Sequence, residues 1–106
     1  DDVIISAGYR IDPTEIEETL ATHEAVADAG VIGVPDETRG EVPKAYIVLS
    51  RGTDHDPGSS LTETLREFTR AHLAQYEYPR EFVYLDELPT TVTGKTERTA
   101  LESREE

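Results

Sequence analysis

The sequence predicts an α+β domain, in which an N-terminal β-hairpin is followed by a small three-stranded sheet with helices packed on it. Short apolar runs bounded by glycine and proline indicate the strands. Two capping-box patterns, each followed by apolar residues at helical spacing, indicate helices between them. No internal repeat or domain boundary interrupts the 106 residues, so we expect 1–106 to form one domain with a thin core.

The first predicted element is a hairpin. The apolar runs Val3-Ile4-Ile5 and Tyr9-Arg10-Ile11 flank the small-residue turn Ser6-Ala7-Gly8, which predicts a β-hairpin with a three-residue loop. Glycine in that turn would let a ligand approach the main chain closely. Arg10 follows at once and can meet a phosphate or carboxylate with its planar guanidinium.

A helix is expected after the hairpin. Asp12 suits the N-cap, Pro13 the first helical position and Glu15 the third position of a capping box. Ile16 and Leu20 share one face of this helix, which predicts the side that packs on the core.

Two strands are expected next, at residues 26–34 and 42–49. The second has apolar positions on both faces, which predicts a central strand covered on both sides. The polar connector 35–40 joins them. Arg39 lies on this connector beside Gly40, and functional residues concentrate on such loops, although a solvent-exposed arginine is the default.

The capping-box pattern recurs at residues 60–63 and predicts a second helix that ends before Pro79. The turn 76–80 then gathers two tyrosines, a proline and an arginine. It is either a structured turn with half-buried rings or a platform for a ligand ring with a cation for a phosphate. A third strand is expected at 81–85 and a short helix at 96–103. The second helix has one apolar stripe: Leu61, Leu65, Phe68, His72 and Tyr76.

Composition excludes several classes of function. The formal net charge of -13 argues against general nucleic-acid binding. No apolar run approaches the length of a membrane span, and no basic, apolar leader is visible, so a cytoplasmic location is expected. The chain has no cysteine, which excludes disulfides and thiolate sites, and its three histidines form no close ligand pair, so no metal site is expected.

The 23 acidic residues are spread along the whole chain. A solvated acidic surface explains this pattern, and adaptation to high salt explains it more specifically, because salt screens repulsion between like charges. The halophilic hypothesis predicts that the domain unfolds more readily at ~10 mM than at ~1 M salt. Denaturation measured at both concentrations tests it, and equal stability would contradict it.

One short stretch carries the strongest hint of chemistry. Residues 90–96 read Thr-Thr-Val-Thr-Gly-Lys-Thr, and Lys95 is one of two lysines in the chain. Small polar residues and glycine form a turn that can carry an ammonium into a neighbouring site, although an exposed surface lysine is the alternative. No Walker loop, dinucleotide fingerprint or catalytic triad accompanies it, so the chain has no complete active site of its own.

Three motifs in order give the chain a family resemblance: residues 1–11, the turn Tyr78-Pro79-Arg80, and residues 88–95, Leu-Pro-Thr-Thr-Val-Thr-Gly-Lys. Residues 33–36 and 39–41 fit the same pattern. With them the chain resembles the C-terminal domain of AMP-forming acyl-CoA synthetases, in the adenylate-forming ligase superfamily and closest to the medium-chain branch. The resemblance covers essentially the whole chain.

The resemblance implies a two-step reaction. A carboxylic acid and ATP give an acyl-adenylate and pyrophosphate, and CoA then attacks the adenylate to give the thioester and AMP. It implies that Lys95 is catalytic and contacts ATP with Arg10, that Asp1 is the hinge, and that Mg²⁺ binds outside this domain. The residues that it places on the CoA side are Ala7, Gly8, Tyr9, Arg39, Arg70, Tyr78, Pro79 and Arg80.

The chain departs from the family pattern at Ala7, Asp12 and Thr96, where Ser, Gly and Ile are usual. The large N-terminal adenylation domain, which would hold the ATP loop and the acyl pocket, is not in the sequence, so the chain alone is expected to be an inactive, mobile lid domain. Two alternatives stay open: a related ligase that delivers its acyl group to a carrier protein, and a free-standing interaction module without catalysis.

Overall fold

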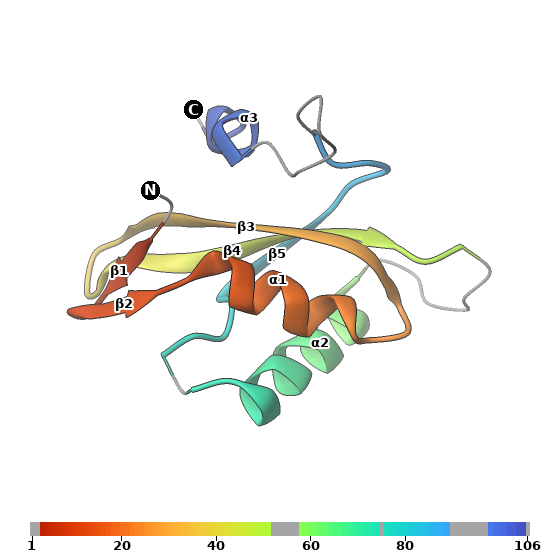
Figure 1. The fold of residues 1–106 in the computed structure, drawn as a ribbon, viewed down its shortest axis with the longest axis horizontal. Helices are drawn as coiled ribbons and strands as arrows, with labels where there is room; N and C mark the ends of the chain where they lie inside the picture. The colour runs from red at the N-terminus through yellow and green to blue at the C-terminus, as the bar shows by residue number, and fades with distance from the viewer. Residues whose placement is uncertain (1–2, 52–57, 75, 90–97, 106) are drawn as a thin grey trace.

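The computed structural model describes residues 3–51, 58–74, 76–89 and 98–105 and has the predicted α+β class (Figure 1). One five-stranded sheet carries α1 and α2 on one face and α3 on the other. The elements in order are β1 (Ile4–Ser6), β2 (Tyr9–Ile11), α1 (Pro13–Ala21), β3 (Val26–Asp36), β4 (Gly40–Leu49), α2 (Ser59–His72), β5 (Glu81–Tyr84) and α3 (Arg98–Ser103).

Strand β4 is central, as predicted from its two apolar faces. It is antiparallel to β3 along its length and parallel to β5 over Lys44 to Ile47. The hairpin joins this sheet because Ser6 of β1 pairs with Gly40 of β4. The predicted hairpin and three-stranded sheet therefore form one continuous sheet.

The hairpin turn has two residues, so the expected three-residue loop is wrong. Ser6 pairs directly with Tyr9, which leaves Ala7 and Gly8 as the turn, with φ values of 51° and 85°. Two positive φ values match the right-handed twist of the flanking strands. Ala7 carries a cost of about 1 kcal/mol for this left-handed backbone, which glycine would not.

The predicted N-cap of α1 is confirmed. The backbone N–H of Thr14 donates to Asp12 Oδ1 at 2.9 Å, and Ile16 and Leu20 are fully buried. The Glu15 carboxyl lies beside Glu77, which belongs to the turn that follows α2. A hydrogen bond shared between these two carboxyls, together with their charge repulsion, raises the pKa of Glu15.

The second capping box is wrong. The N-cap of α2 is Gly58, with no side-chain hydrogen bond to the first turn. The helix also ends at His72, well before Pro79, because Leu73 adopts extended backbone and packs against the core.

The buried stripe of α2 differs from the predicted one at its C-terminal half. Leu61 and Leu65 are buried as expected, and Thr69 completes the stripe, with its hydroxyl donating to the carbonyl of Leu65 at 3.1 Å. His72 is exposed and Tyr76 lies beyond the helix. The early end of α2 thereby frees the residues from 76 onwards to form a site.

Each face of the sheet has its own core. Ile11, Ile16, Leu20, Ile47 and Leu65 belong to the cluster beneath α1 and α2. The smaller cluster on the α3 face consists of Ile32, Val34, Val42, Tyr46, Leu88 and Leu101. Leu101 is fully buried, so α3 is held to the sheet by its own side chain.

Candidate functional site

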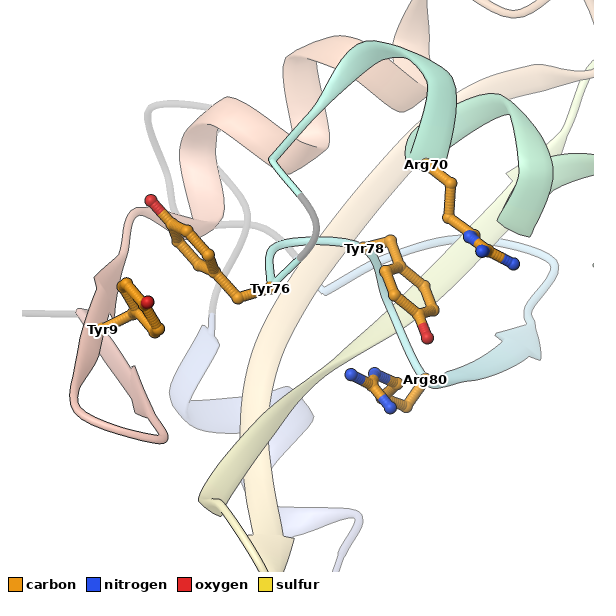
Figure 2. A pocket seen from close by; sticks show the side chains of 5 residues that line it. All are labelled: Tyr9, Arg70, Tyr76, Tyr78 and Arg80. Carbon is orange, nitrogen blue, oxygen red and sulfur yellow. The ribbon is translucent and has the colours of Figure 1, made fainter.

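A hollow of about 340 Å³ lies between the hairpin, the C-terminal end of α2 and the turn that follows it (Figure 2). Tyr9, Arg70, Tyr76, Tyr78 and Arg80 line it. The structure thus brings together four side chains that the sequence analysis assigned to one ligand, from three separate segments. Tyr76 was not among the side chains assigned to CoA, although the sequence analysis named it twice, on the apolar stripe of the helix and in the possible platform at 76–80.

The rings of Tyr9 and Tyr76 close one side of the hollow. They stack with centroids 4.1 Å apart and planes 8° from parallel. Tyr9 is still 53% exposed, so its outer face remains open to a further ring or to a neighbouring domain. The stack ties the hairpin to the turn after α2.

Tyr78 lies between two guanidinium groups, as Figure 2 shows. The Cζ atoms of Arg80 and Arg70 lie 4.5 and 5.3 Å from the centre of its ring. Cation–π contacts hold both cations in place without neutralising them. The exposed ion pair of Arg70 with Glu67, at 3.2 Å, adds little. Two restrained positive charges flanking an aromatic ring suit a ligand that carries both a ring and phosphate groups.

The backbone of Arg80 is fixed to β4, and its side chain lines the hollow. Its backbone N–H donates to the carbonyl of Pro43 at 2.9 Å, which fixes the turn to β4. Within the part of the chain that the structure describes, its buried side-chain Nε has no hydrogen-bond partner. A buried donor without a partner costs free energy, so the described residues leave part of the hydrogen-bonding capacity of the Arg80 guanidinium unused. Pro79 is buried and sets the direction of this turn.

Arg39 lies on the turn between β3 and β4, outside the lining of the hollow. Its Nη1 is 3.6 Å from Asp36 Oδ2. The pKa of Asp36 is lowered, chiefly because its carboxylate accepts the backbone N–H of Arg39 and also that of Thr38. The positive charges of Arg39 and Arg80 lower the pKa of Asp36 further.

The tip of the hairpin is open. Ala7 and Gly8 are exposed, and a Cβ built on Gly8 would meet nothing within 4 Å. Arg10 pairs across the hairpin with Ile5 and is exposed. Because neighbouring side chains in a strand point to opposite faces, Arg10 and Tyr9 lie on opposite faces of the hairpin, and the structure does not bring Arg10 into the hollow.

Lys95 and Asp1 lie outside the described residues. The described chain resumes after Lys95 at Arg98, whose Nη2 donates to Glu17 Oε1 at 2.6 Å. Glu17 Oε2 also accepts the backbone N–H of Val31 at 2.9 Å. Burial raises the pKa of Glu17, whereas these two partners lower it. The start of α3 is therefore anchored to α1 and to the edge of β3.

The described residues contain no group of three His, Asp or Glu side chains arranged to hold a metal ion. In the same residues, no helix has the length and apolar character that crossing a membrane requires.

Comparison with known proteins identifies the family. Residues 15–95 match a family model described as the AMP-binding enzyme C-terminal domain. The chain belongs to this family. The match ends at Lys95 and includes the turn 76–80, so the residues that line the hollow lie within the matched range, apart from Tyr9 of the hairpin.

Relatives and solved structures agree with this family. The mitochondrial acyl-coenzyme A synthetase ACSM5 of Homo sapiens is 48% identical over 99% of this chain and 18% of its own length. The 4-hydroxybutyrate–CoA ligase 1 of Metallosphaera sedula is 46% identical over 100% of this chain and 18% of its length. The structure of an acyl-CoA synthetase from Brucella canis matches with a TM-score of 0.90 and 42% identity, over 99% of this chain and 19% of that one.

This AMP-binding C-terminal domain thus spans less than a fifth of the length of the relatives named above. The relatives are ligases, and the Brucella canis acyl-CoA synthetase shares this fold over the matched part of its chain. The recognition of the family from its motifs and the α+β class are both confirmed.

Proposed function

We propose that this chain is the mobile C-terminal domain of an acyl-CoA synthetase, which activates a carboxylic acid with ATP to an acyl-adenylate and then transfers the acyl group to CoA. The observation that supports this most is the hollow in which Arg70 and Arg80 flank Tyr78 beside an open hairpin tip. CoA carries an adenine ring and several phosphates at its nucleotide end and a thiol at the other end. The nucleotide end matches the hollow, and the thiol end matches the open hairpin tip.

In the adenylation step, Lys95 supplies a cation between the acyl carboxylate and the ATP phosphate. A positive charge placed there offsets the negative charge that gathers as the two anions meet. Arg10, on the face of the hairpin opposite to Tyr9, assists at ATP. Mg²⁺ and the acyl pocket belong to the N-terminal adenylation domain, so the isolated chain has no turnover.

In the thioester step, the domain turns about Asp1. It then presents the hairpin and the hollow, instead of Lys95, to the N-terminal adenylation domain. Gly8, with no side chain and open space around it, lets the pantetheine arm pass close to the backbone. The remaining assignments for CoA are Ala7, Tyr9, Arg39, Arg70, Tyr78, Pro79 and Arg80. The arginines bind its phosphates, and the tyrosines offer faces on which adenine can stack.

The full-length protein tests this proposal directly. It is incubated with a panel of carboxylic acids, ATP and Mg²⁺, with either CoA or a phosphopantetheinylated carrier protein as acceptor. We expect pyrophosphate, AMP and an acyl-CoA thioester in equal amounts. Acyl transfer to the carrier protein alone would favour the related ligase, and no ATP consumption with any acid would favour the non-catalytic interaction module.

Arg80→Ala is expected to raise KM for CoA at least about tenfold, because a charge-assisted contact to phosphate is lost, about 1.4 kcal/mol. Acyl-adenylate formation without CoA is expected to stay within about twofold of wild type, since uniform ligand binding affects only the step that uses that ligand. Arg51→Ala serves as the control, because it removes an exposed arginine that follows the C-terminal end of β4 and does not line the hollow. An unchanged KM for CoA in Arg80→Ala would contradict the assignment of the hollow.

A further inference from the structure

We propose that Asp36 is a positioning residue for thioester formation. Asp36 fixes the turn between β3 and β4, and that turn holds the Ala7–Gly8 turn of the hairpin in place. This inference rests on the proposed function, because it takes the hairpin tip as the place where the thiol arm passes. It adds a residue that lines neither the hollow nor the tip. The argument begins at the carboxylate of Asp36.

Asp36 organises the turn that joins β3 to β4. Its Oδ2 accepts the backbone N–H of Arg39 at 2.9 Å and that of Thr38 at 3.1 Å. The same oxygen lies 3.6 Å from Arg39 Nη1. A side chain that bonds to its own following backbone fixes the conformation of a turn. Asp36 thereby sets where the carbonyl of Arg39 points.

The carbonyl of Arg39 points at the hairpin. It accepts the backbone N–H of Ala7, the first turn residue, at 2.7 Å. Next to this bond, Ser6 pairs with Gly40, and beyond that pair the N–H of Ile5 donates to Glu41 Oε1 at 3.2 Å. The hairpin is therefore attached through three consecutive residues: Arg39, the last residue of the turn that Asp36 fixes, and the first two residues of β4.

The two turns that meet here both contain left-handed backbone. Ala7 and Gly8 have φ values of 51° and 85°, and Gly40 has a φ of 88°. A non-glycine residue such as Ala7 stays in this region only when its surroundings hold it there. The short bond from Ala7 N–H to Arg39 supplies that hold, so release of Arg39 would let the hairpin tip relax to another conformation.

Thioester formation requires the reacting groups to be aligned closely, and a displacement of about 1 Å can cost about a hundredfold in rate. A tip that shifts when Arg39 is released would misplace the passage for the thiol arm. Acyl-adenylate formation, which we assign to Lys95 with Arg10 on the opposite face of the hairpin from Tyr9, does not use this passage. The geometry thus predicts that loss of Asp36 separates the two half-reactions.

The experiment compares three variants of the full-length protein. Asp36→Ala removes both the acceptor and the charge, Asp36→Asn keeps an acceptor oxygen and removes the charge, and Glu37→Ala removes a charge from the neighbouring exposed position. Each is tested for acyl-adenylate formation in a single turnover without CoA, and then for transfer after CoA is added. Hydrogen exchange of a peptide spanning 4–11 is measured in parallel.

We expect Asp36→Ala to slow transfer to CoA at least about tenfold, with acyl-adenylate formation within about twofold of wild type and faster exchange in the hairpin peptide. Asp36→Asn should recover most of the transfer rate, because its amide oxygen can accept the same backbone N–H groups. Glu37→Ala should match wild type in every measurement.

Different outcomes overturn different claims. If hairpin exchange and transfer in Asp36→Ala both match wild type, the positioning role is wrong while the proposed function stands. If both half-reactions slow equally, Asp36 supports the fold generally and the positioning role is again wrong. A wild-type protein that forms neither adenylate nor thioester overturns the proposed function, and hairpin exchange in the variants still shows whether Asp36 fixes the turn.

Discussion

Replacing Lys95 with alanine is expected to slow acyl-adenylate formation at least about a hundredfold, a loss of about 2.7 kcal/mol of transition-state stabilisation. The adenylation step brings two anions together, and a preorganised cation between them is worth most where water is excluded. Pyrophosphate release by the full-length enzyme in the absence of CoA measures this step alone.

The chain contains a matched control in its other lysine. Lys44 is tied to the fold by ion pairs with Glu105 at 2.9 Å and Glu81 at 3.8 Å, and its side chain is only 13% exposed. Lys44→Ala should therefore change stability more than acyl-adenylate formation. Transfer to CoA from a preformed adenylate should survive in Lys95→Ala, because we assign that step to the hairpin tip and the hollow. Acyl-adenylate formation by Lys95→Ala within about tenfold of wild type would remove Lys95 from catalysis.

Local physics explains which elements were predictable. The Asp12 cap depends on a side chain and a backbone N–H two positions apart. The central place of β4 depends on the apolar pattern of one strand. The hairpin loop was predicted one residue too long, because Ala7 adopts a φ of 51° that sequence reasoning reserves for glycine. Its neighbour on the β3–β4 turn, rather than its own residue type, holds it there.

In the candidate site too, features that depend on nearby residues were predictable, and features that join distant segments were not. Tyr78 and Arg80 were predictable because they lie in one short turn, on either side of Pro79, and the family resemblance assigned them together. The stack of Tyr9 on Tyr76 joins segments far apart in the chain, so only the fold brings it into view. Asp36 was noticed as part of a motif, yet its task depends on a bond from Ala7 to Arg39 that no sequence period encodes.

The contact between Arg98 and Glu17 is also nonlocal, and its removal is the second large effect that we expect. Arg98→Ala should lower the local stability of α1 and α3 by about 2 kcal/mol at neutral pH, somewhat less than a fully buried pair, because the two side chains are 18% and 14% exposed. The loss leaves the Glu17 carboxylate without its guanidinium, although the N–H of Val31 still donates to it. Hydrogen exchange of peptides from both helices in the full-length protein measures this change.

The pH dependence of that loss identifies its cause. Burial raises the folded-state pKa of Glu17 above its ordinary value of 4.5, and Arg98 opposes the rise. The charge on Glu17 therefore costs stability above its folded pKa and costs nothing below 4.5, where the carboxyl is protonated in both states. Without Arg98 the folded pKa rises further. The deficit of Arg98→Ala should thus be largest at about pH 7 and should shrink as the pH falls toward about 5.

Glu17→Gln supplies the control, since its amide oxygen can still accept the N–H of Val31 without a charge. In that background, Arg98→Ala should cost much less and should lose its pH dependence, because groups in direct contact are not additive. Additive effects of the two substitutions would show that Arg98 acts through other contacts. Because Arg98 lies only three residues after Lys95 in the sequence, a non-additive result would mean that the charge pair anchoring α3 acts close to the proposed catalytic lysine.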